Sequence, residues 1–234
     1  MNFFRIKSDL PLTVYAPQWN YLIGDAQWAD NTKIDKIRQW LIDNEDYIKQ
    51  NYQQTHDGLT GLGPDSVTAR FGSYNLFDFI PKLPELDDML TFMRRSYLEY
   101  KQYDLTNIAE SNITCWYNIV RNGQDIDEHL HNAGSWSYLT GNMHLDNYPT
   151  KTYYRSAYNI LENEYYPVPN IKGGLTIFPS CVLHRADTFN ETSRVRVSLA
   201  FDIRLGFTGP HETKGLKGYP FMNENIFNQL AKAP

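Results

Sequence analysis

The hydrophobic pattern of this chain changes its period near Thr106, and this change constrains the fold more than any other feature. Before it, apolar residues recur at helical spacing in two segments, 33–49 and 84–100. After it, apolar side chains occupy every second position of 113–119, as in a half-buried strand. Helices first and strands later predict an α+β fold, mainly β, with helices packed on one side of a mainly antiparallel sheet structure.

Further segments have the composition or alternation of strands. They are 126–132, 136–145, 151–158, 173–178, 181–189 and 194–204. About eight strands in the second half of the chain suit a double-stranded β-helix, or jelly roll. We also expect a strand at 11–17, a short strand near Val67–Phe71 and a closing helix at 223–232. Thr32 is the expected cap of the first helix, and Pro84 the expected start of the second.

The length of the chain suits one large β-rich domain or two small ones, with a sizeable core, and the run of strands in the second half favours one. We therefore expect a single domain over 1–234. Within it, 1–105 forms a helical support region, 106–204 the jelly-roll core and 205–234 a C-terminal tail.

Composition excludes several classes of protein. The net charge of -5 argues against a nucleic-acid-binding surface. The two cysteines, Cys115 and Cys181, do not form a disulfide framework, and a reducing cytoplasm fits them. Charges at Arg5, Lys7 and Asp9 argue against a signal peptide, and no stretch approaches the ~20 apolar residues of a membrane span. We expect a cytoplasmic protein with a small-molecule or peptide partner and no membrane partner; its oligomeric state stays open.

His129 and His131 occupy alternate positions of an expected strand. Alternate residues of a strand share a face, so both imidazoles can point at one spot. A third imidazole, from His184 on a distant strand, could complete three corners of a metal site. Asp127 is expected on the same face, where it could replace one ligand or orient one from behind. Taken alone the pair is a weak signal, because two surface histidines would look the same.

His144 and Asp146 form a rival pair with the usual His-x-Asp spacing of iron ligands. The pair stands at the end of an expected strand, just before Pro149. A polar strand end entering a turn explains it as well, so it is the second choice for the metal.

Arg194, Arg196 and Ser198 alternate along the last expected strand. If this strand forms a hairpin with the strand that begins near His184, an arginine returns to the level of that histidine. A buried guanidinium needs an anion, and its planar fork suits a carboxylate. We expect one arginine to hold an anionic co-substrate and the other to be exposed, with the choice depending on strand register.

Several short motifs between residues 73 and 204 follow one another in a specific order. They are Ser73-Tyr74-Asn75-Leu76, Leu83-Pro84-Glu85-Leu86, Trp116-Tyr117-Asn118, Gly123, His129-Leu130-His131, Thr140-Gly141, the segment from Gly174 to Ser180, His184, and the segment from Arg196 to Phe201. Together they resemble the 2-oxoglutarate and Fe(II)-dependent oxygenases, in particular a group related to the prolyl hydroxylases.

This resemblance implies a double-stranded β-helix with Fe(II) and 2-oxoglutarate as cofactors. His129 would be the first iron ligand and His184 the distal one, while Arg196 would bind the far carboxylate of 2-oxoglutarate beside Ser198. The chain departs from the wider family at the second ligand, because His131 replaces the usual Asp or Glu. The site then has three histidines, or takes a carboxylate from elsewhere, or directs His131 at the substrate; we predict that His131 is a ligand.

The function implied by the resemblance is that of an oxidoreductase, a 2-oxoglutarate-dependent dioxygenase that hydroxylates its substrate. Two other functions stay open. A cupin-type dioxygenase with three histidines would need iron but no 2-oxoglutarate, and a non-catalytic jelly-roll binding module would need neither. The arginines that follow His184 favour the first function.

Overall fold

The structure is a computed structural model that describes residues 1–8, 10, 12–15, 18–103, 110–131, 137–156, 165–205 and 217–232. Its strands are β1 Asn2–Lys7, β2 Asn20–Gln27, β3 Ser111–Val120, β4 Gln124–His129, β5 Ser137–His144, β6 Lys151–Arg155, β7 Tyr165–Pro169, β8 Gly174–Pro179, β9 His184–Phe189, β10 Arg196–Leu205 and β11 Tyr219–Met222. Its helices are α1 Asn31–Asp43, α2 Glu45–Asn51, α3 Glu85–Lys101 and α4 Glu224–Lys232, with short 3-10 helices η1 Val67–Arg70 and η2 Leu76–Phe79.

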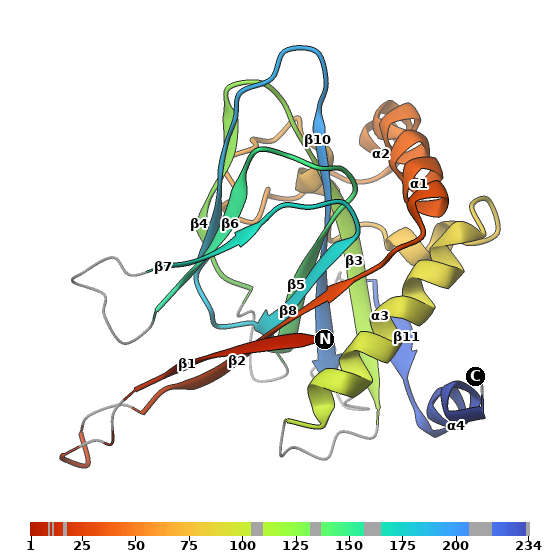
Figure 1. The fold of residues 1–234 in the computed structure, drawn as a ribbon. Helices are drawn as coiled ribbons and strands as arrows, with labels where there is room; N and C mark the ends of the chain where they lie inside the picture. The colour runs from red at the N-terminus through yellow and green to blue at the C-terminus, as the bar shows by residue number, and fades with distance from the viewer. Residues whose placement is uncertain are drawn as a thin grey trace.

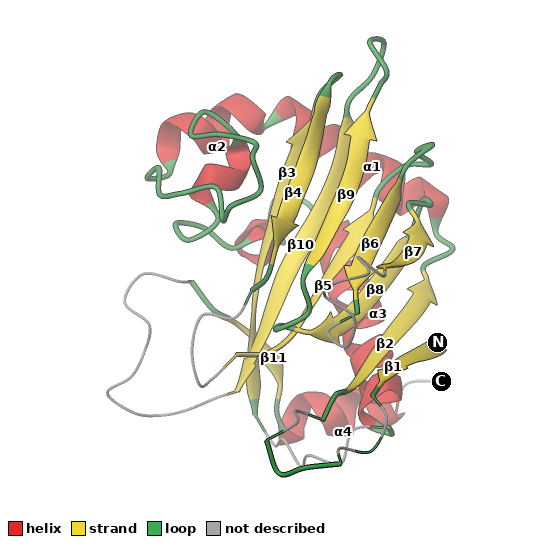
Figure 2. Ribbon diagram, turned by 90° about the vertical axis from the view of Figure 1, so that its left-hand side faces the viewer, coloured by secondary structure: helices red, strands yellow, loops and turns green. Residues whose placement is uncertain are grey.

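The strands form two antiparallel sheets (Figures 1 and 2). The 7-stranded sheet has the order β1-β2-β8-β5-β10-β3-β11, and the 4-stranded sheet has the order β4-β9-β6-β7. From β3 onward the chain crosses repeatedly between them: β4, β6, β7 and β9 lie in the small sheet, and β5, β8 and β10 in the large one. This alternation is the double-stranded β-helix, so the predicted fold class is confirmed.

Helices α1, α2 and α3 cover the face of the large sheet that is turned away from the small sheet (Figure 1). The core between them is built from every second residue of the central strands and from one stripe of α3. These residues are Ile113, Cys115, Tyr117, Ile119, Val197, Leu199, Phe201, Ile203, Leu86, Met89, Leu90, Met93 and Tyr97. Full burial of such side chains contributes ~1.5–3 kcal/mol each, which fixes the face that each strand turns to the helices. The alternate residues of β3 and β10 therefore face the small sheet.

The expected helix 33–49 is two helices, because the chain bends at Asn44 between α1 and α2. The Asn44 side chain donates a hydrogen bond to the main-chain oxygen of Trp40 at 2.8 Å, an interaction by which asparagine competes with the helix. The cap is Asp30 rather than Thr32, since its carboxylate accepts from the Lys33 main-chain N–H at 3.1 Å. Pro84 caps α3, close to the expected start. The closing helix expected at 223–232 is α4.

Two expected strands are wrong. In place of a strand at 11–17, residues 12–15 form a bend and turn between β1 and β2, and Leu12 is 99% exposed. A run of strand-forming residues needs a partner strand, and none lies beside it among the described residues. Val67–Phe71 contains η1, which is capped by Ser66: its hydroxyl accepts from the Ala69 main-chain N–H at 3.2 Å. The expected strand ends at 132, 136 and 157–158 lie outside the described residues.

Four strands were missed: β1 and β2, which precede α1, and the edge strands β7 and β11, which contain proline. Pro167 and Pro169 lie in β7, at the edge of the small sheet, and Pro220 lies in β11, at the edge of the large one. Proline has no N–H for the strand ladder, so it weakens the sequence signal and is tolerated at sheet edges.

The hairpin expected between the strands of His184 and Arg196 does not form. Strand β9 pairs with β4 and β6, whereas β10 pairs with β3 and β5 in the other sheet. His184 and Arg196 therefore belong to opposite walls of the jelly roll.

Gly141, in the middle of β5, lies where no side chain fits. A Cβ atom there would be 2.3 Å from the Phe201 ring and 2.3 Å from the main-chain oxygen of Thr176. We expect Gly141→Ala to lower the free energy of unfolding by about 1–3 kcal/mol, the usual cost of overpacking. Gly218→Ala is the control, because its Cβ meets only Asn112 side-chain atoms, the nearer at 3.3 Å. Urea denaturation measures both, and equal midpoints would contradict the prediction.

None of the helices among the described residues combines the length and apolar character needed to cross a membrane.

Candidate active site

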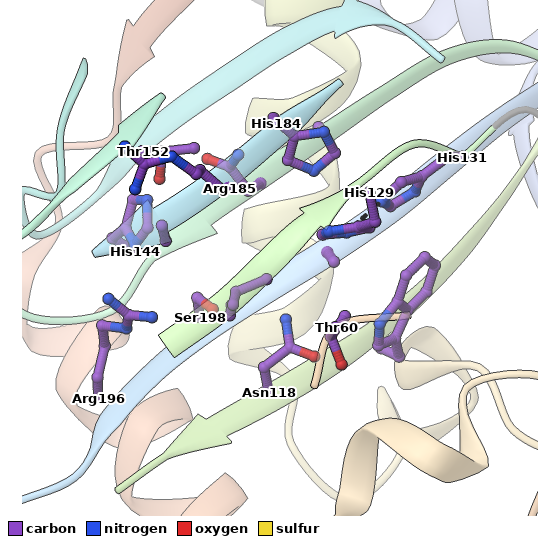
Figure 3. Close-up of a pocket in the computed structure, with 16 residues that line it drawn as sticks. Thr60, Asn118, His129, His131, His144, Thr152, His184, Arg185, Arg196 and Ser198 are labelled. Atoms are coloured by element: carbon purple, nitrogen blue, oxygen red, sulfur yellow. Dashed lines mark hydrogen bonds between the residues drawn. The ribbon is translucent and has the colours of Figure 1, made fainter. Parts of the chain in front are cut away.

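A pocket opens between the two sheets, and both contribute to its walls (Figure 3). It is lined by Thr60, Trp116, Asn118, Ile126, His129, His131, Gly141, Asn142, His144, Thr152, His184, Arg185, Ala186, Arg196, Ser198 and Ala200. Arg196, Ser198 and Ala200 are alternate residues of β10, so their side chains lie on one face of the strand. This face forms the floor of the pocket.

Three histidines converge at one end of this pocket. His129 closes β4 and pairs in register with His184, the first residue of β9, which brings two distant segments side by side. His131 lies two residues beyond the end of β4, and its main-chain N–H donates to the main-chain oxygen of Ser180 at 3.0 Å. The possible ligand atoms of the three side chains all lie within 4.8 Å of one another. These are the three histidines that the sequence proposed as metal ligands.

In each histidine, the Nδ1 atom faces an oxygen. His129 Nδ1 lies 2.7 Å from the main-chain oxygen of Asp127, and His184 Nδ1 lies 3.1 Å from that of Val182. A carbonyl oxygen only accepts, so these partners place the proton on Nδ1 and leave a lone pair on Nε2. His131 Nδ1 lies 2.7 Å from the Asp202 carboxylate. Anchored Nδ1 atoms of this kind orient the metal-binding histidines of many proteins.

The two Nε2 atoms of His129 and His131 lie 3.3 Å apart. With both protons on Nδ1, they present two lone pairs to each other and form no hydrogen bond. Bonds of about 2.1 Å at right angles from one metal ion would place two nitrogens about 3 Å apart. The donor set therefore fits a divalent metal ion, and a cation between these atoms would remove their repulsion.

Burial keeps two of these imidazoles neutral. Desolvation, followed by the nearby His131, lowers the pKa of His129 to about 4. Desolvation and the neighbouring His129 hold the pKa of His184 well below its ordinary value. Neutral imidazole is the form that binds metal, so neither ligand must lose a proton at pH 7.

Aromatic rings hold the histidines in place. The Trp116 ring stacks on His131, with centroids 5.6 Å apart and planes at 24°. Tyr154 stacks on His184 at 6.1 Å, and Phe178 meets the same ring edge-on at 4.8 Å. These contacts restrict the orientations of the His131 and His184 rings.

Arg196 lies at the opposite end of the pocket, with Ser198 between it and the histidines (Figure 3). It is 1% exposed. Its Nη1 donates to the main-chain oxygen of Asp187 at 2.9 Å and to the Thr150 hydroxyl at 3.3 Å, whereas Nε and Nη2 have no partner among the described residues. Burial lowers the pKa of Arg196 to about 10. A buried guanidinium without a carboxylate is costly, so this end of the pocket is suited to an anion.

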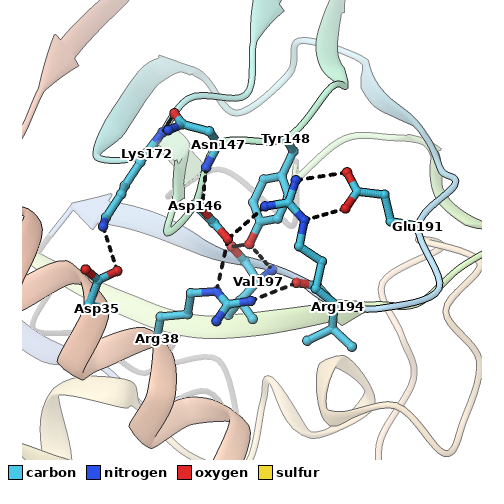
Figure 4. A network of polar contacts seen from close by, with 10 residues as sticks. Asp35, Arg38, Asp146, Asn147, Tyr148, Lys172, Glu191, Arg194 and Val197 are labelled. Atoms are coloured by element: carbon cyan, nitrogen blue, oxygen red, sulfur yellow. Dashed lines mark hydrogen bonds and ion pairs between the residues drawn. The ribbon is translucent and has the colours of Figure 1, made fainter.

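Arg194 lies outside the pocket, where it pairs with Glu191 and with Asp146, the latter at 3.2 Å (Figure 4). Its side chain is 35% exposed. Strand β10 begins at Arg196, so the alternation that would place both arginines on one face does not extend back to Arg194. The structure thus brings Arg196, and not Arg194, to the wall that faces the histidines.

The rival pair of His144 and Asp146 does not form a metal site. Asp146 lies 3.6 Å from Arg38 Nε in addition to its contact with Arg194 (Figure 4). His144 lies opposite Ser198 in the β5–β10 register, and its buried Nδ1 has no partner among the described residues. Burial, and then the charge of Arg196, lower the pKa of His144 to about 3. His144 is a neutral group at the arginine end of the pocket.

Asp127 was expected on the face of His129 and His131, and this is wrong. The register of β4 shifts between Ile126 and His129, so these two residues both line the pocket although they are three positions apart. The Asp127 side chain is exposed and lies against Gly61. Only the main-chain oxygen of Asp127 contributes to the site, as the partner of His129 Nδ1.

Asp202 and Thr140 contact His131 and were missed in the sequence. The Thr140 hydroxyl lies 2.9 Å from His131 Nδ1 and donates to the main-chain oxygen of Phe201 at 2.7 Å. Burial opposes ionisation of Asp202, but His131 and then Arg204 outweigh it and lower the pKa of this carboxyl. The signal was present, because two further steps of alternation from Ser198 along β10 reach Asp202 on the same face.

Comparisons with known proteins agree with this geometry. The sequence profile of a family described as "Putative 2OG-Fe(II) oxygenase" matches residues 114–202. The fold is similar to that of a Pseudomonas putida prolyl-4-hydroxylase, with 14% identity, a TM-score of 0.55 and coverage of 79% of this chain and 93% of that chain. A comparison with curated proteins returned no match to this sequence.

Two further solved structures share the fold, and both proteins come from nogalamycin biosynthesis. The non-heme alpha ketoglutarate dependent epimerase SnoN has 12% identity and a TM-score of 0.55, with 87% of this chain and 89% of that chain covered. The carbocyclase SnoK, also non-heme and alpha ketoglutarate dependent, has 11% identity and a TM-score of 0.51, with the same coverage. At these identities the likeness concerns the fold.

The matching family profile, the fold and the three-histidine cluster together support a 2-oxoglutarate-dependent oxygenase. The resemblance inferred from the sequence is thereby confirmed: this chain is similar to the 2OG-Fe(II) oxygenases, whose cofactors are Fe(II) and 2-oxoglutarate.

Proposed function

We propose that this protein is an Fe(II)- and 2-oxoglutarate-dependent dioxygenase that hydroxylates its substrate. One observation carries the proposal: a single pocket has three anchored imidazoles at one end and a buried, incompletely paired arginine at the other. A site that binds only a metal ion would need the three imidazoles but not the arginine. The arginine calls for an anion that reaches across the pocket, as a short dicarboxylate does.

Five of the residues that line the pocket then have a definite task. His129, His131 and His184 would hold Fe(II) through their Nε2 atoms, while Arg196 would bind the far carboxylate of 2-oxoglutarate with Ser198 donating beside it. Bound iron would supply oxidation of an unactivated C–H bond by dioxygen: one oxygen atom would enter the substrate as a hydroxyl group, and the other would enter succinate as 2-oxoglutarate loses carbon dioxide. Arg194 keeps its partners outside the pocket and takes no part.

The proposed substrate is a small molecule or a peptide. The fold occurs both in a prolyl-4-hydroxylase and in enzymes of nogalamycin biosynthesis, so it accommodates either class. The charge of -5 does not favour a nucleic acid.

Anaerobic binding measurements test the proposal without a known substrate. Calorimetry with Mn(II), an ion that does not activate oxygen, is expected to show 2-oxoglutarate binding that requires the metal. Aerobic incubation with Fe(II) should then form succinate only when 2-oxoglutarate is present. Metal binding without 2-oxoglutarate binding would overturn the proposal in favour of the cupin-type dioxygenase. Absence of metal binding would leave a non-catalytic module.

A further inference from the structure

His131 differs from the other two histidines in the partner of its Nδ1 atom. The Nδ1 atoms of His129 and His184 face uncharged main-chain oxygens. The Nδ1 of His131 lies 2.7 Å from a carboxylate oxygen of Asp202. Within the cluster, the residue that replaces the usual carboxylate ligand is the one that has a carboxylate as its partner.

The pair is shielded from water and held in a fixed geometry. The His131 and Asp202 side chains are 7% and 13% exposed. The second Asp202 oxygen accepts from Arg204 Nη2 at 3.3 Å. Asp202 on β10 is in register with Thr140 on β5, so both strands present a group to the same Nδ1 atom. A charge in such a place is screened less than a charge at the surface.

The net charge of the metal site indicates what the contact between Asp202 and His131 supplies. Two histidines and one carboxylate leave a divalent ion with a net charge of about +1, whereas three neutral histidines leave about +2. A carboxylate that accepts the Nδ1 proton makes the imidazole a more basic ligand, and loss of such a partner typically weakens metal binding about 10–100-fold. The His131 ring alone separates the Asp202 carboxylate from the position that a metal ion would occupy.

We propose that Asp202 is a positioning residue that supplies, through His131, the negative charge that a carboxylate ligand would bring directly to the metal. The inference rests on the proposed metal site, because it concerns the charge of that site. Alternate residues of β10 then serve both ends of the pocket. Arg196 at the start of the strand holds the anion, and Asp202 on the same face supports the metal.

The first test replaces Asp202→Asn, which keeps the shape and an oxygen that can accept from Nδ1 but removes the charge. Calorimetry with Mn(II) should show an affinity about 10–100-fold weaker than wild type. The Tm of the metal-free protein is measured beside it, because the substitution also removes the charge that faces Arg204. Asp25→Asn is the matched control: it removes a half-buried carboxylate on β2 that accepts from Thr176 at 2.8 Å, and it should leave Mn(II) affinity unchanged. Equal Mn(II) affinities for wild type and Asp202→Asn would overturn the inference.

A double variant separates charge from structural support. His131→Asp alone would place two carboxylates side by side, whereas His131→Asp with Asp202→Asn would move the one charge to the ligand position. We therefore expect the double variant to bind Mn(II) more tightly than either single variant. If Asp202 only supports the fold, the two losses add, and that result would contradict the inference.

Failure of the proposed function has a different signature. Wild-type protein that binds Mn(II) but not 2-oxoglutarate would contradict the dioxygenase proposal, while the affinity difference of Asp202→Asn would still support the role of Asp202. Wild-type protein that binds no Mn(II) would overturn both.

Discussion

Arg196→Met is expected to weaken 2-oxoglutarate binding at least about 100-fold, which corresponds to about 3 kcal/mol and lies within the usual cost of removing one partner of a buried charge pair. The physical reason is that Arg196 lines the pocket and that two of its guanidinium nitrogens have no partner among the described residues. Anaerobic calorimetry in the presence of Mn(II) measures the loss. Mn(II) affinity itself should not change, because the arginine lies at the end of the pocket opposite the histidines.

The same variant should make the protein without 2-oxoglutarate more stable. An incompletely paired buried charge costs free energy, and replacing buried charges with apolar groups of similar volume often stabilises by about 1–4 kcal/mol. We expect the Tm of Arg196→Met to rise and the further rise caused by 2-oxoglutarate to disappear. Arg194→Met is the control, since its partners Glu191 and Asp146 lie outside the pocket. Equal losses of 2-oxoglutarate affinity in the two variants would refute the assignment.

His184→Ala is expected to abolish measurable metal binding. The substitution removes a direct ligand, so the loss should exceed the about 100-fold effect of outer partners. His144→Ala is a matched control, because it also removes a buried imidazole from the same pocket but at the arginine end. Iron content after anaerobic reconstitution, measured beside Tm, reports both. Loss of iron from His144→Ala with retention by His184→Ala would restore the His144 and Asp146 pair as the metal site.

Much of the fold was predictable because its signals are local. The switch from helical spacing to alternation identified the helices, the strands from β3 to β10 other than β7, and the jelly-roll class, since each period reflects the geometry of a few neighbouring residues. The failures have local causes as well. Asn44 interrupts a helix by hydrogen bonding to its main chain, and prolines hide the edge strands β7 and β11. The predicted hairpin failed because strand order depends on contacts across the whole domain.

The candidate site likewise has features that local sequence determined and features that tertiary structure decided. Sequence alone determined which residue types were available and which alternate positions of β10 share a face, because side-chain direction in a strand repeats every two residues. Tertiary structure decided that β4 pairs with β9, so that His129 meets His184. It also decided that Arg196 faces the pocket while Arg194 precedes the strand, and that Asp202 stands behind His131. Register and sheet membership arise from pairing between distant segments, and no local pattern encodes them.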